Sequence, residues 1–249
     1  MNFLRRLGSA YALIWRTYRA WAPTLLLLAL IVFLPLGLLN ALTMDVELDS
    51  LDLTSGIKLA AVVLAVAAVT ATGLIGEVFF SGAIAVSLTH PHGQGPPSLR
   101  EIAGRLAYGR LIAVDLVFVA LVAVGLLLGL IPGVLAFVWL ALAGPVVELE
   151  ERTARGALAR SMHLVKGSFW LVFWVLVPVQ VLGDALGHFL ESLVHDLLGD
   201  TFVAAWLAET ATDIALSPIF AVAAVLLTIE LIGQRDGKAP SLRPTPVPA

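Results

Sequence analysis

Three carboxylates lie within or at the ends of long apolar runs in this sequence. They are Glu77, Asp115 and Glu230. A carboxylate at the centre of a bilayer costs at least about 2.5 kcal/mol, so each is a candidate intramembrane functional residue. Asp115 and Glu230 each have an arginine five residues away, so snorkelling or an interhelical hydrogen bond explains them equally well. Glu77 lies deeper, among small residues. Snorkelling or an interhelical hydrogen bond is the simpler interpretation of this residue too, and the alternative is a proton or cation relay centred on it.

Four residues near the end of the fifth apolar run have types that bind metals. Asp184, His188, Glu191 and His195 are spaced by 4, 3 and 4 residues, which places them on one face of a helix. Two histidines and two carboxylates at this spacing are candidate Zn²⁺ ligands. The alternative is the hydrated face of an amphipathic helix that lies on the outer leaflet. The pair His90 and His92 is a second, less specific pattern in a Gly/Pro-rich loop.

Other kinds of chemistry have no sequence signature here. The chain has no cysteine, which excludes disulfides, thiolate metal sites and cysteine nucleophiles. The sequence also lacks H-E-x-x-H, G-x-S-x-G, Walker A and G-x-G-x-x-G motifs. No catalytic residue, no cofactor and no nucleic-acid partner are therefore predicted.

The composition places these residues in a membrane protein. Of 249 residues, 59% are hydrophobic and 13% are charged, against about 45–50% and about 25% in an average soluble domain. Several apolar runs approach or exceed the roughly 20 residues that cross a bilayer. We predict an all-α, polytopic membrane protein, with residues 1–236 as a single helical membrane domain and 237–249 as a disordered cytoplasmic tail. Six spans are predicted, at 22–42, 58–82, 111–131, 133–147, 168–182 and 212–232.

The distribution of basic residues predicts the topology. If both termini, 89–110 and 148–167 lie on one side, that side holds 14 of the 15 basic residues. The positive-inside rule then predicts six spans with both termini in the cytoplasm. Arginine outnumbers lysine in a chain rich in alanine, leucine and glycine, which is typical of GC-rich bacterial genomes. The predicted location is therefore a bacterial cytoplasmic membrane.

Three segments combine basic and apolar residues at helical spacing just before a span. These elbows cover 3–21, 98–110 and 151–167, and each is followed by aromatic residues and a two-helix hairpin. Such helices lie in the headgroup layer with their apolar face in acyl chains. Membrane lipids are thus the predicted partners, contacted by Arg16, Arg19, Arg105, Arg110, Arg155, Arg160 and Lys166. The three elbow–hairpin units are candidate internal repeats, unless every cytoplasmic loop of such a protein is simply basic and amphipathic.

Small and acidic residues supply further expectations. Gly125, Gly129 and Gly133 permit close helix packing, within the chain or against a second copy. The sequence Ile131-Pro132-Gly133 predicts a tight turn between spans three and four. In the acidic cluster Glu148, Glu150 and Glu151, capping and charge pairing are expected, with Glu151–Arg155 as an i,i+4 pair.

The stretch from 131 to 173 also resembles a known bacterial family. Its matching features are Pro132-Gly133, Ala143-Gly144-Pro145, Glu148, Ala157-Leu158, Arg160-Ser161, Leu164-Val165-Lys166-Gly167 and Phe169-Trp170. They are similar to the glycerophosphoryl diester phosphodiesterase membrane-domain family of uncharacterised polytopic proteins. The resemblance implies a six-helix membrane domain and no catalysis, because no residues for phosphodiester hydrolysis map onto this chain.

Three hypotheses for function follow from these patterns. The first is a non-enzymatic scaffold that binds lipids or other membrane proteins, with a homo-oligomer as one form. The second is a transporter or channel for a small solute or lipid, with Glu77 as a coupling site; the short fourth span and the proline-interrupted helices also favour it. The third, an intramembrane enzyme that acts on lipid headgroups, rests on the family label alone.

Overall fold

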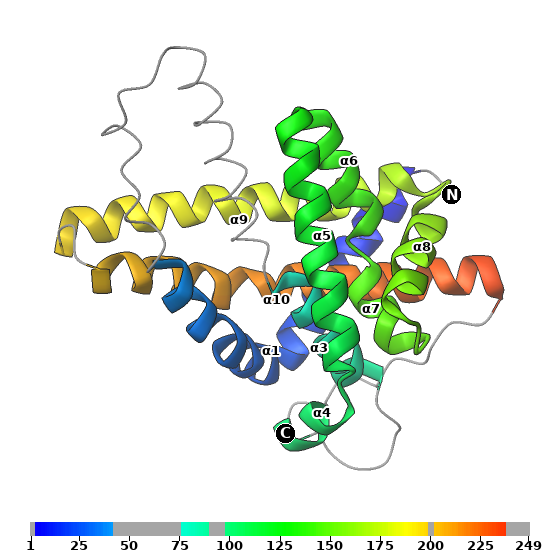
Figure 1. The fold of residues 1–249 in the computed structure, drawn as a ribbon, viewed down its shortest axis with the longest axis horizontal. Helices are drawn as coiled ribbons and strands as arrows, with labels where there is room; N and C mark the ends of the chain where they lie inside the picture. The colour runs from blue at the N-terminus through cyan, green and yellow to red at the C-terminus, as the bar shows by residue number, and fades with distance from the viewer. Residues whose placement is uncertain (1–2, 42–75, 90–97, 199–201, 238–249) are drawn as a thin grey trace.

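A computed structural model of the protein describes residues 3–41, 76–89, 98–198 and 202–237. Every secondary-structure element in these ranges is an α-helix, in agreement with the predicted all-α class. Figure 1 shows the helices α1 (Phe3–Ala41), α3 (Glu77–Thr89), α4 (Leu99–Arg105), α5 (Tyr108–Leu128), α6 (Leu130–Leu140), α7 (Ala143–Leu149), α8 (Ala154–Val165), α9 (Phe169–Leu198) and α10 (Phe202–Asp236).

Five helical segments are long and apolar enough to cross a membrane. They are Phe3–Gly37, Tyr108–Leu128, Leu130–Leu149, Phe169–Val194 and Thr210–Asp236. Most of the predicted second span, 58–82, lies outside the described residues. Its last part belongs to α3, an apolar helix of 13 residues, which extends only about 20 Å at 1.5 Å per residue. The structure therefore supports a multi-pass membrane protein with five candidate spans.

Short local signals begin the elbow helices. Ser98 and Glu101 form a capping box at the start of α4, because the Ser98 hydroxyl accepts from the Glu101 amide while the Glu101 carboxylate accepts from the Ser98 amide. At the start of α8, the Thr153 hydroxyl accepts a hydrogen bond of 3.3 Å from the Gly156 amide. Each of these two elbow segments thus contains a separate helix, although residues 108–110 of the predicted elbow at 98–110 belong to α5.

The turn between α5 and α6 lies earlier than the sequence predicts. It is made by Gly129, whose φ of 136° suits a residue without a side chain, and the predicted turn at Ile131-Pro132-Gly133 is wrong. Pro132 instead lies in the first turn of α6, where a missing N–H costs no helical hydrogen bond. A second break, at Ala141-Leu142, divides the fourth span into α6 and α7.

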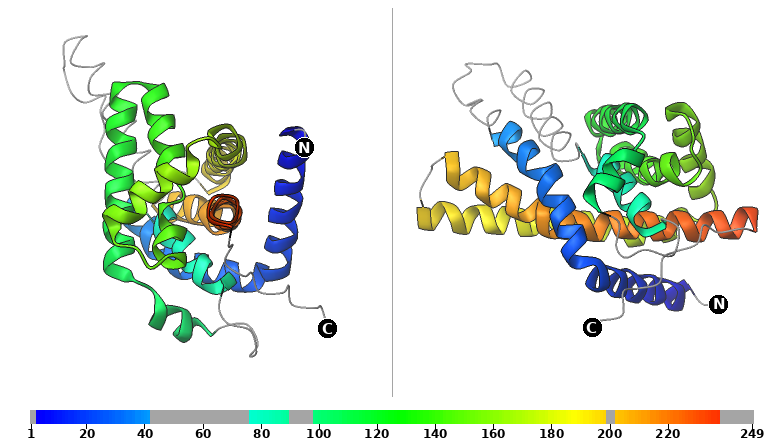
Figure 2. Two further views of the ribbon diagram at one scale, coloured as in Figure 1. Left: turned by 90° about the vertical axis from the view of Figure 1, so that its right-hand side faces the viewer. Right: turned by 90° about the horizontal axis from the view of Figure 1, so that it is seen from below.

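Two long helices absorb segments that were predicted to be separate. The elbow at 3–21 is continuous with the first span in α1, and Figure 2 shows that this helix changes direction partway along. Pro23 lies inside α1 and is a sufficient cause of a kink. The segment from 183 to 198 continues α9 rather than forming its own helix. No proline separates it from the span, so nothing forces the helix to end.

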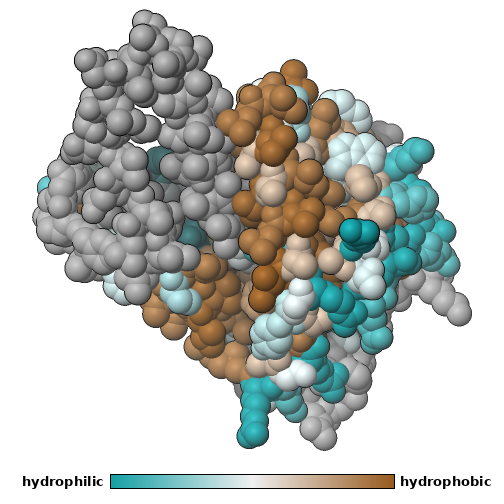
Figure 3. All heavy atoms as spheres, viewed as in Figure 1, coloured by the Kyte–Doolittle hydropathy of each residue, from teal (hydrophilic) through white to brown (hydrophobic). Residues whose placement is uncertain are grey.

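The helices form two pairs that run crosswise. The long helices α9 and α10 lie side by side, and so do α5 and α6 (Figure 1). When α9 and α10 are viewed end-on, α5 and α6 are seen lengthwise (Figure 2). In Figure 3, hydrophilic residues gather near α8 and α4, at the right and bottom of the view, and hydrophobic residues cover α5 and α6.

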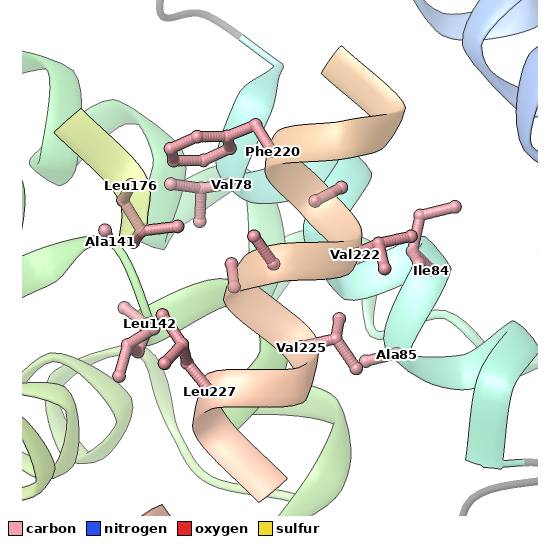
Figure 4. Close-up of a cluster of buried hydrophobic side chains, with 14 of the residues drawn as sticks. Val78, Ile84, Ala85, Ala141, Leu142, Leu176, Phe220, Val222, Val225 and Leu227 are labelled. Atoms are coloured by element: carbon pink, nitrogen blue, oxygen red, sulfur yellow. The ribbon is translucent and has the colours of Figure 1, made fainter. Parts of the chain in front are cut away.

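Helix α10 lies at the centre of the apolar core. It is the most buried of the five candidate spans. Figure 4 shows its residues Phe220, Val222, Val225 and Leu227 among side chains from α3, from the break between α6 and α7, and from α9. Helix α3, which begins with Glu77, packs against α10, whereas α5, which carries Asp115, packs against α6 and α3.

Close contact of α5 with α6 depends on two of the predicted packing glycines. A Cβ on Gly125 would lie 2.8 Å from the Cα of Gly133, and a Cβ on Gly133 would lie 3.0 Å from the Leu126 amide nitrogen. Gly129 forms the turn and contributes no helix face. Gly125 and Gly133 therefore serve packing within the chain.

The predicted repeat of three elbow–hairpin units involves residues 42–75, which lie outside the described residues.

Candidate functional site

Asp115 of α5 holds the beginning of α3. Its Oδ2 accepts a hydrogen bond of 2.8 Å from the Gly76 amide, and its Oδ1 accepts one of 3.1 Å from the Val78 amide. The carboxylate is only 5% exposed. The first amides of a helix have no partner within the helix, and no water is available in an apolar interior. Asp115 therefore acts as a cap supplied by a neighbouring helix. Of the two sequence interpretations, snorkelling and an interhelical hydrogen bond, the structure shows the second.

Glu77, the first residue of α3, points into the same buried region. It is 5% exposed, and its Oε1 accepts a hydrogen bond of 2.6 Å from the Ser217 hydroxyl of α10. Ser217 directly precedes Pro218, which lies inside α10. Two carboxylates, Glu77 and Asp115, thus flank the beginning of one helix in the core.

Interrupted helices surround this pair of carboxylates. Gly144, just after the break between α6 and α7, packs so closely on α3 that a Cβ there would overlap the Val78 carbonyl oxygen. In Figure 4, Val78 of α3 lies near Phe220 of α10 and Ala141 of the same break. The arrangement places the buried carboxyl of Glu77 beside the Ser217 hydroxyl, at the end of α3 that packs on the break between α6 and α7 and next to Pro218 in α10. Such a group can hold or pass a proton, or help to coordinate a small cation.

A second pair of contacts fixes the elbow between α4 and α5. Glu148, at the end of α7, accepts a hydrogen bond of 2.9 Å from the Ala107 amide. Arg110 donates from Nη1 to the carbonyl oxygens of Glu151 (2.9 Å) and Arg152 (3.3 Å). The α4–α5 elbow and the loop before α8 therefore hold each other, and Arg110 does not pair with Asp115.

Arg160 of α8 lies at the centre of an ion-pair network. It bonds to Glu150, with 2.9 Å between Nη2 and Oε1, and to Asp236 at the end of α10. Arg152 also bonds to Glu150, at 2.6 Å. Burial opposes the charge of Arg160, but its hydrogen bonds and charge interactions with Glu150 and Asp236 outweigh burial and raise its pKa. The network ties α8 to the end of α10.

Glu230 joins the two ends of the described chain. It accepts hydrogen bonds from Arg6 in α1, at 2.9 and 3.0 Å, and from Gln234, at 2.8 Å. The predicted neighbour Arg235 instead lies 3.5 Å from His163 of α8. These contacts bring three segments together: the beginning of α1, the end of α10 and the elbow helix α8.

The i,i+4 pair expected between Glu151 and Arg155 is absent from the ion pairs of the described residues. Such a pair needs both residues in one helix, but α8 begins only at Ala154. Glu151 lies before it with a φ of 50°. The neighbouring Glu150 makes the ion pairs instead.

The other predicted lipid contacts lie on the surface. Arg16, Arg19, Arg105, Arg155 and Lys166 are exposed, whereas the Arg160 side chain is only 11% exposed. The apolar face of α8, with Ala157, Ser161, Leu164 and Val165, is buried in the protein. The expectation that this face enters acyl chains is therefore wrong, because the protein core covers it.

Two hydroxyl groups serve carbonyls that helix breaks leave without partners. Trp174 of α9 would bond to the amide of residue 178, but Pro178 has none; the Tyr11 hydroxyl of α1 donates to this carbonyl at 2.6 Å. Ser161 donates to the Trp139 carbonyl, in the last turn of α6, at 2.8 Å. The position of Pro178 in the sequence predicts that the Trp174 carbonyl lacks its helical partner. No pattern of neighbouring residues predicts that Tyr11 donates to it, or that Ser217 donates to Glu77.

The four candidate metal ligands all lie on α9. The backbone of this helix includes Asp184, His188, Glu191 and His195, and His188 is exposed. The other three side chains, and the pair His90 and His92, lie outside the described residues. Among the described side chains, no group of three or more His, Asp or Glu could hold a metal ion.

Comparison of the chain with family models, with curated proteins and with solved structures found no match. The comparisons therefore add neither a family nor an activity to what the residues show.

Substitution of Asp115 by asparagine tests the capping of α3. Asparagine keeps one acceptor oxygen but turns an amide NH₂ toward a backbone donor, so the free energy of unfolding in detergent should fall by about 2 kcal/mol. Glu230→Gln is the control, because its ion pair with Arg6 is partly exposed and should be worth about 0–1 kcal/mol. Equal losses in the two variants would contradict a special role for Asp115.

Replacement of Tyr11 by phenylalanine removes only the hydroxyl that serves Trp174. We expect a loss of about 1 kcal/mol in the free energy of unfolding. Tyr18→Phe on the same helix is matched, because the Tyr18 hydroxyl makes no hydrogen bond within the described residues and its ring stacks on Trp15. Denaturation curves of Tyr11→Phe and Tyr18→Phe that coincide would refute the assignment.

Proposed function

We propose that this protein is a non-enzymatic membrane domain that organises lipids and binds other membrane proteins. The observation that carries the proposal is how the described polar groups are used. Asp115, Glu148, Glu150 and Glu230 hold helix ends and elbows together. Beyond Arg110, the exposed side chains of α5 are apolar. The internal polar groups therefore maintain the fold, and the exposed apolar face of α5 is free to contact lipids or other membrane proteins.

The exposed face of α5 is the surface proposed for partner contact. Ile112, Leu116, Val124, Leu127 and Leu128 are all exposed there. The opposite face of the same helix, with Val114, Phe118 and Val122, is buried. Lipid tails cover the exposed face where no partner binds. A second copy of the chain is one possible partner, which would give a homo-oligomer.

Photo-cross-linking in native membranes tests partner binding. Photoreactive residues at Leu116 and Val124 should both cross-link to the same discrete membrane protein, or to a second copy. The matched controls are Val114 and Val122, two buried positions on the same helix, which should cross-link only within the chain. Partners are identified by mass spectrometry. Lipid adducts alone at Leu116 and Val124, with no discrete protein product, would sink the proposal of a scaffold.

We further propose six spans with both termini and the elbows in the cytoplasm of a bacterium. Two contacts support this topology. Arg6 bonds to Glu230, and Arg160 bonds to Asp236. The beginning of α1, elbow α8 and the end of α10 are therefore neighbours, as a chain with both ends on one side requires. The basic residues of these segments would then share one compartment.

Cysteine accessibility tests this topology on a chain that has no cysteine of its own. Ala159→Cys lies on the exposed face of α8, and Ser192→Cys lies on the exposed face of α9 near its end. A membrane-impermeant maleimide should label Ser192→Cys in intact cells, and Ala159→Cys only after the cells are opened. Labelling of both positions in intact cells would overturn the topology.

A transporter with Glu77 as coupling site is the second candidate function. The specific observation in its favour is the Glu77–Ser217 hydrogen bond beside the break between α6 and α7 and beside Pro218. Proton flux into vesicles with a trapped pH-sensitive dye separates the candidates. A transporter predicts flux that Glu77→Gln abolishes and Arg16→Gln preserves. The scaffold predicts the same dye signal with and without protein.

A further inference from the structure

An exposed cationic group lies where α8, α9 and α10 meet. Its cations are Lys166, directly after α8, and Arg235, near the end of α10, and the imidazole of His163, in the last turn of α8, lies beside Arg235. Arg235 Nη1 lies 3.5 Å from His163 Nε2. Arg235 Nη2 lies 3.6 Å from the place that a Cβ on Gly167 would occupy. Residues about 70 positions apart in the sequence thus form one surface.

Carboxylates near this group already serve other arginines. Asp236 bonds to Arg160, Glu230 bonds to Arg6, and Glu150 bonds to Arg152 and Arg160. None of the ion pairs in the described part of the chain includes Lys166 or Arg235. Lys166 directly precedes Gly167, and Arg235 lies against Gly167. Both positive charges are therefore available to an anion from outside the protein.

The aromatic residues that follow place this cationic group at a membrane border. Trp170 and Trp174, one turn apart at the beginning of α9, are 63% and 47% exposed. Phe169 and Phe173 pack against them edge-on and fix their positions. Exposed tryptophans in membrane proteins lie at the level of the headgroups. A ligand that has an anionic head and apolar chains would contact both the cations and the indole rings.

We propose that this junction, defined by His163, Lys166, Arg235, Trp170 and Trp174, binds an anionic phospholipid. The phosphate lies against Lys166 and Arg235, and His163 donates a hydrogen bond to it. The acyl chains descend along Trp170 and Trp174. The proposal deepens the proposed lipid-organising function and rests on it. It also assigns roles within the elbow α8: Lys166 binds lipid, whereas Arg160 maintains the protein through Glu150 and Asp236.

Photo-labelling of the full chain with lipid probes tests this site directly. The purified protein in vesicles is exposed to phosphatidylglycerol or phosphatidylcholine with a photoreactive headgroup, and adducts are mapped by peptide mass spectrometry. The unmodified protein should give adducts within 161–174 with phosphatidylglycerol, and excess unlabelled phosphatidylglycerol should remove them. Equal labelling by phosphatidylcholine would overturn the proposal. So would displacement by millimolar inorganic phosphate, which would indicate a site for a soluble anion.

Variants assign the labelling to the two cations. A basic residue near a membrane surface contributes about 1 kcal/mol, or about fivefold in affinity, so Lys166→Gln with Arg235→Gln should reduce labelling about 25-fold. The control, Arg16→Gln with Arg19→Gln, removes the same charge from the exposed face of α1 and should leave labelling of 161–174 unchanged. Equal loss in both double variants would mean general attraction to anionic lipid and would overturn the site.

The two proposals fail in different ways. Loss of the lipid site with persistent cross-links from Leu116 and Val124 would contradict only the assignment of this junction. Loss of those protein cross-links with persistent lipid labelling would contradict only the scaffold. Arg235→Lys keeps the charge and should retain most of the labelling, which distinguishes a lost cation from a misfolded junction. Labelling by this variant as low as that of Arg235→Gln would overturn the electrostatic basis of the site.

Discussion

A peptide group at a break in a helix loses its helical partner, and inside an apolar body it finds no water to replace that partner. The described chain meets this constraint at four places with side chains from other helices. Asp115 serves the beginning of α3, Glu148 the α4–α5 elbow, Ser161 the end of α6, and Tyr11 the carbonyl before Pro178 in α9. Each contact joins segments far apart in sequence. At these four places the break in one helix and its packing against another are therefore linked, because the neighbouring helix presents the polar group that the break requires.

This constraint changes how acidic residues in the apolar core relate to function. An intramembrane carboxylate is a functional candidate by default, but both oxygens of Asp115 accept hydrogen bonds from backbone amides. Glu77 differs, because its Oε1 accepts a hydrogen bond from a side chain, the hydroxyl of Ser217. That difference separates a cap from a candidate coupling group. It is the physical basis for keeping transport as the second function, beside a scaffold whose exposed surface consists of apolar helix faces and a basic border.

The basic residues divide in a similar way between internal and external roles. Arg6, Arg110 and Arg160 bond to groups within the protein, whereas Arg16, Arg19 and Lys166 are exposed. In sequence these residues are alike, since each lies in a basic, amphipathic elbow. Burial of the apolar face of α8 against the core turned Arg160 toward Glu150 and Asp236. The same packing left Lys166 exposed and brought Arg235 beside His163 and Gly167.

The sequence by itself determined the features that depend on neighbouring residues. Apolar runs and helical periodicity predicted an all-α membrane protein and most span positions, and Ser98 and Thr153 lie where the elbow helices begin. The tertiary structure decided which helices continue, as α1 and α9 do, and why Gly129 rather than Pro132 makes the turn. It also decided the partners of Asp115, Glu77 and Arg160. Hydrophobicity and capping act within a few residues, but a hydrogen-bond partner depends on which helices cross, and that depends on the packing of the whole chain.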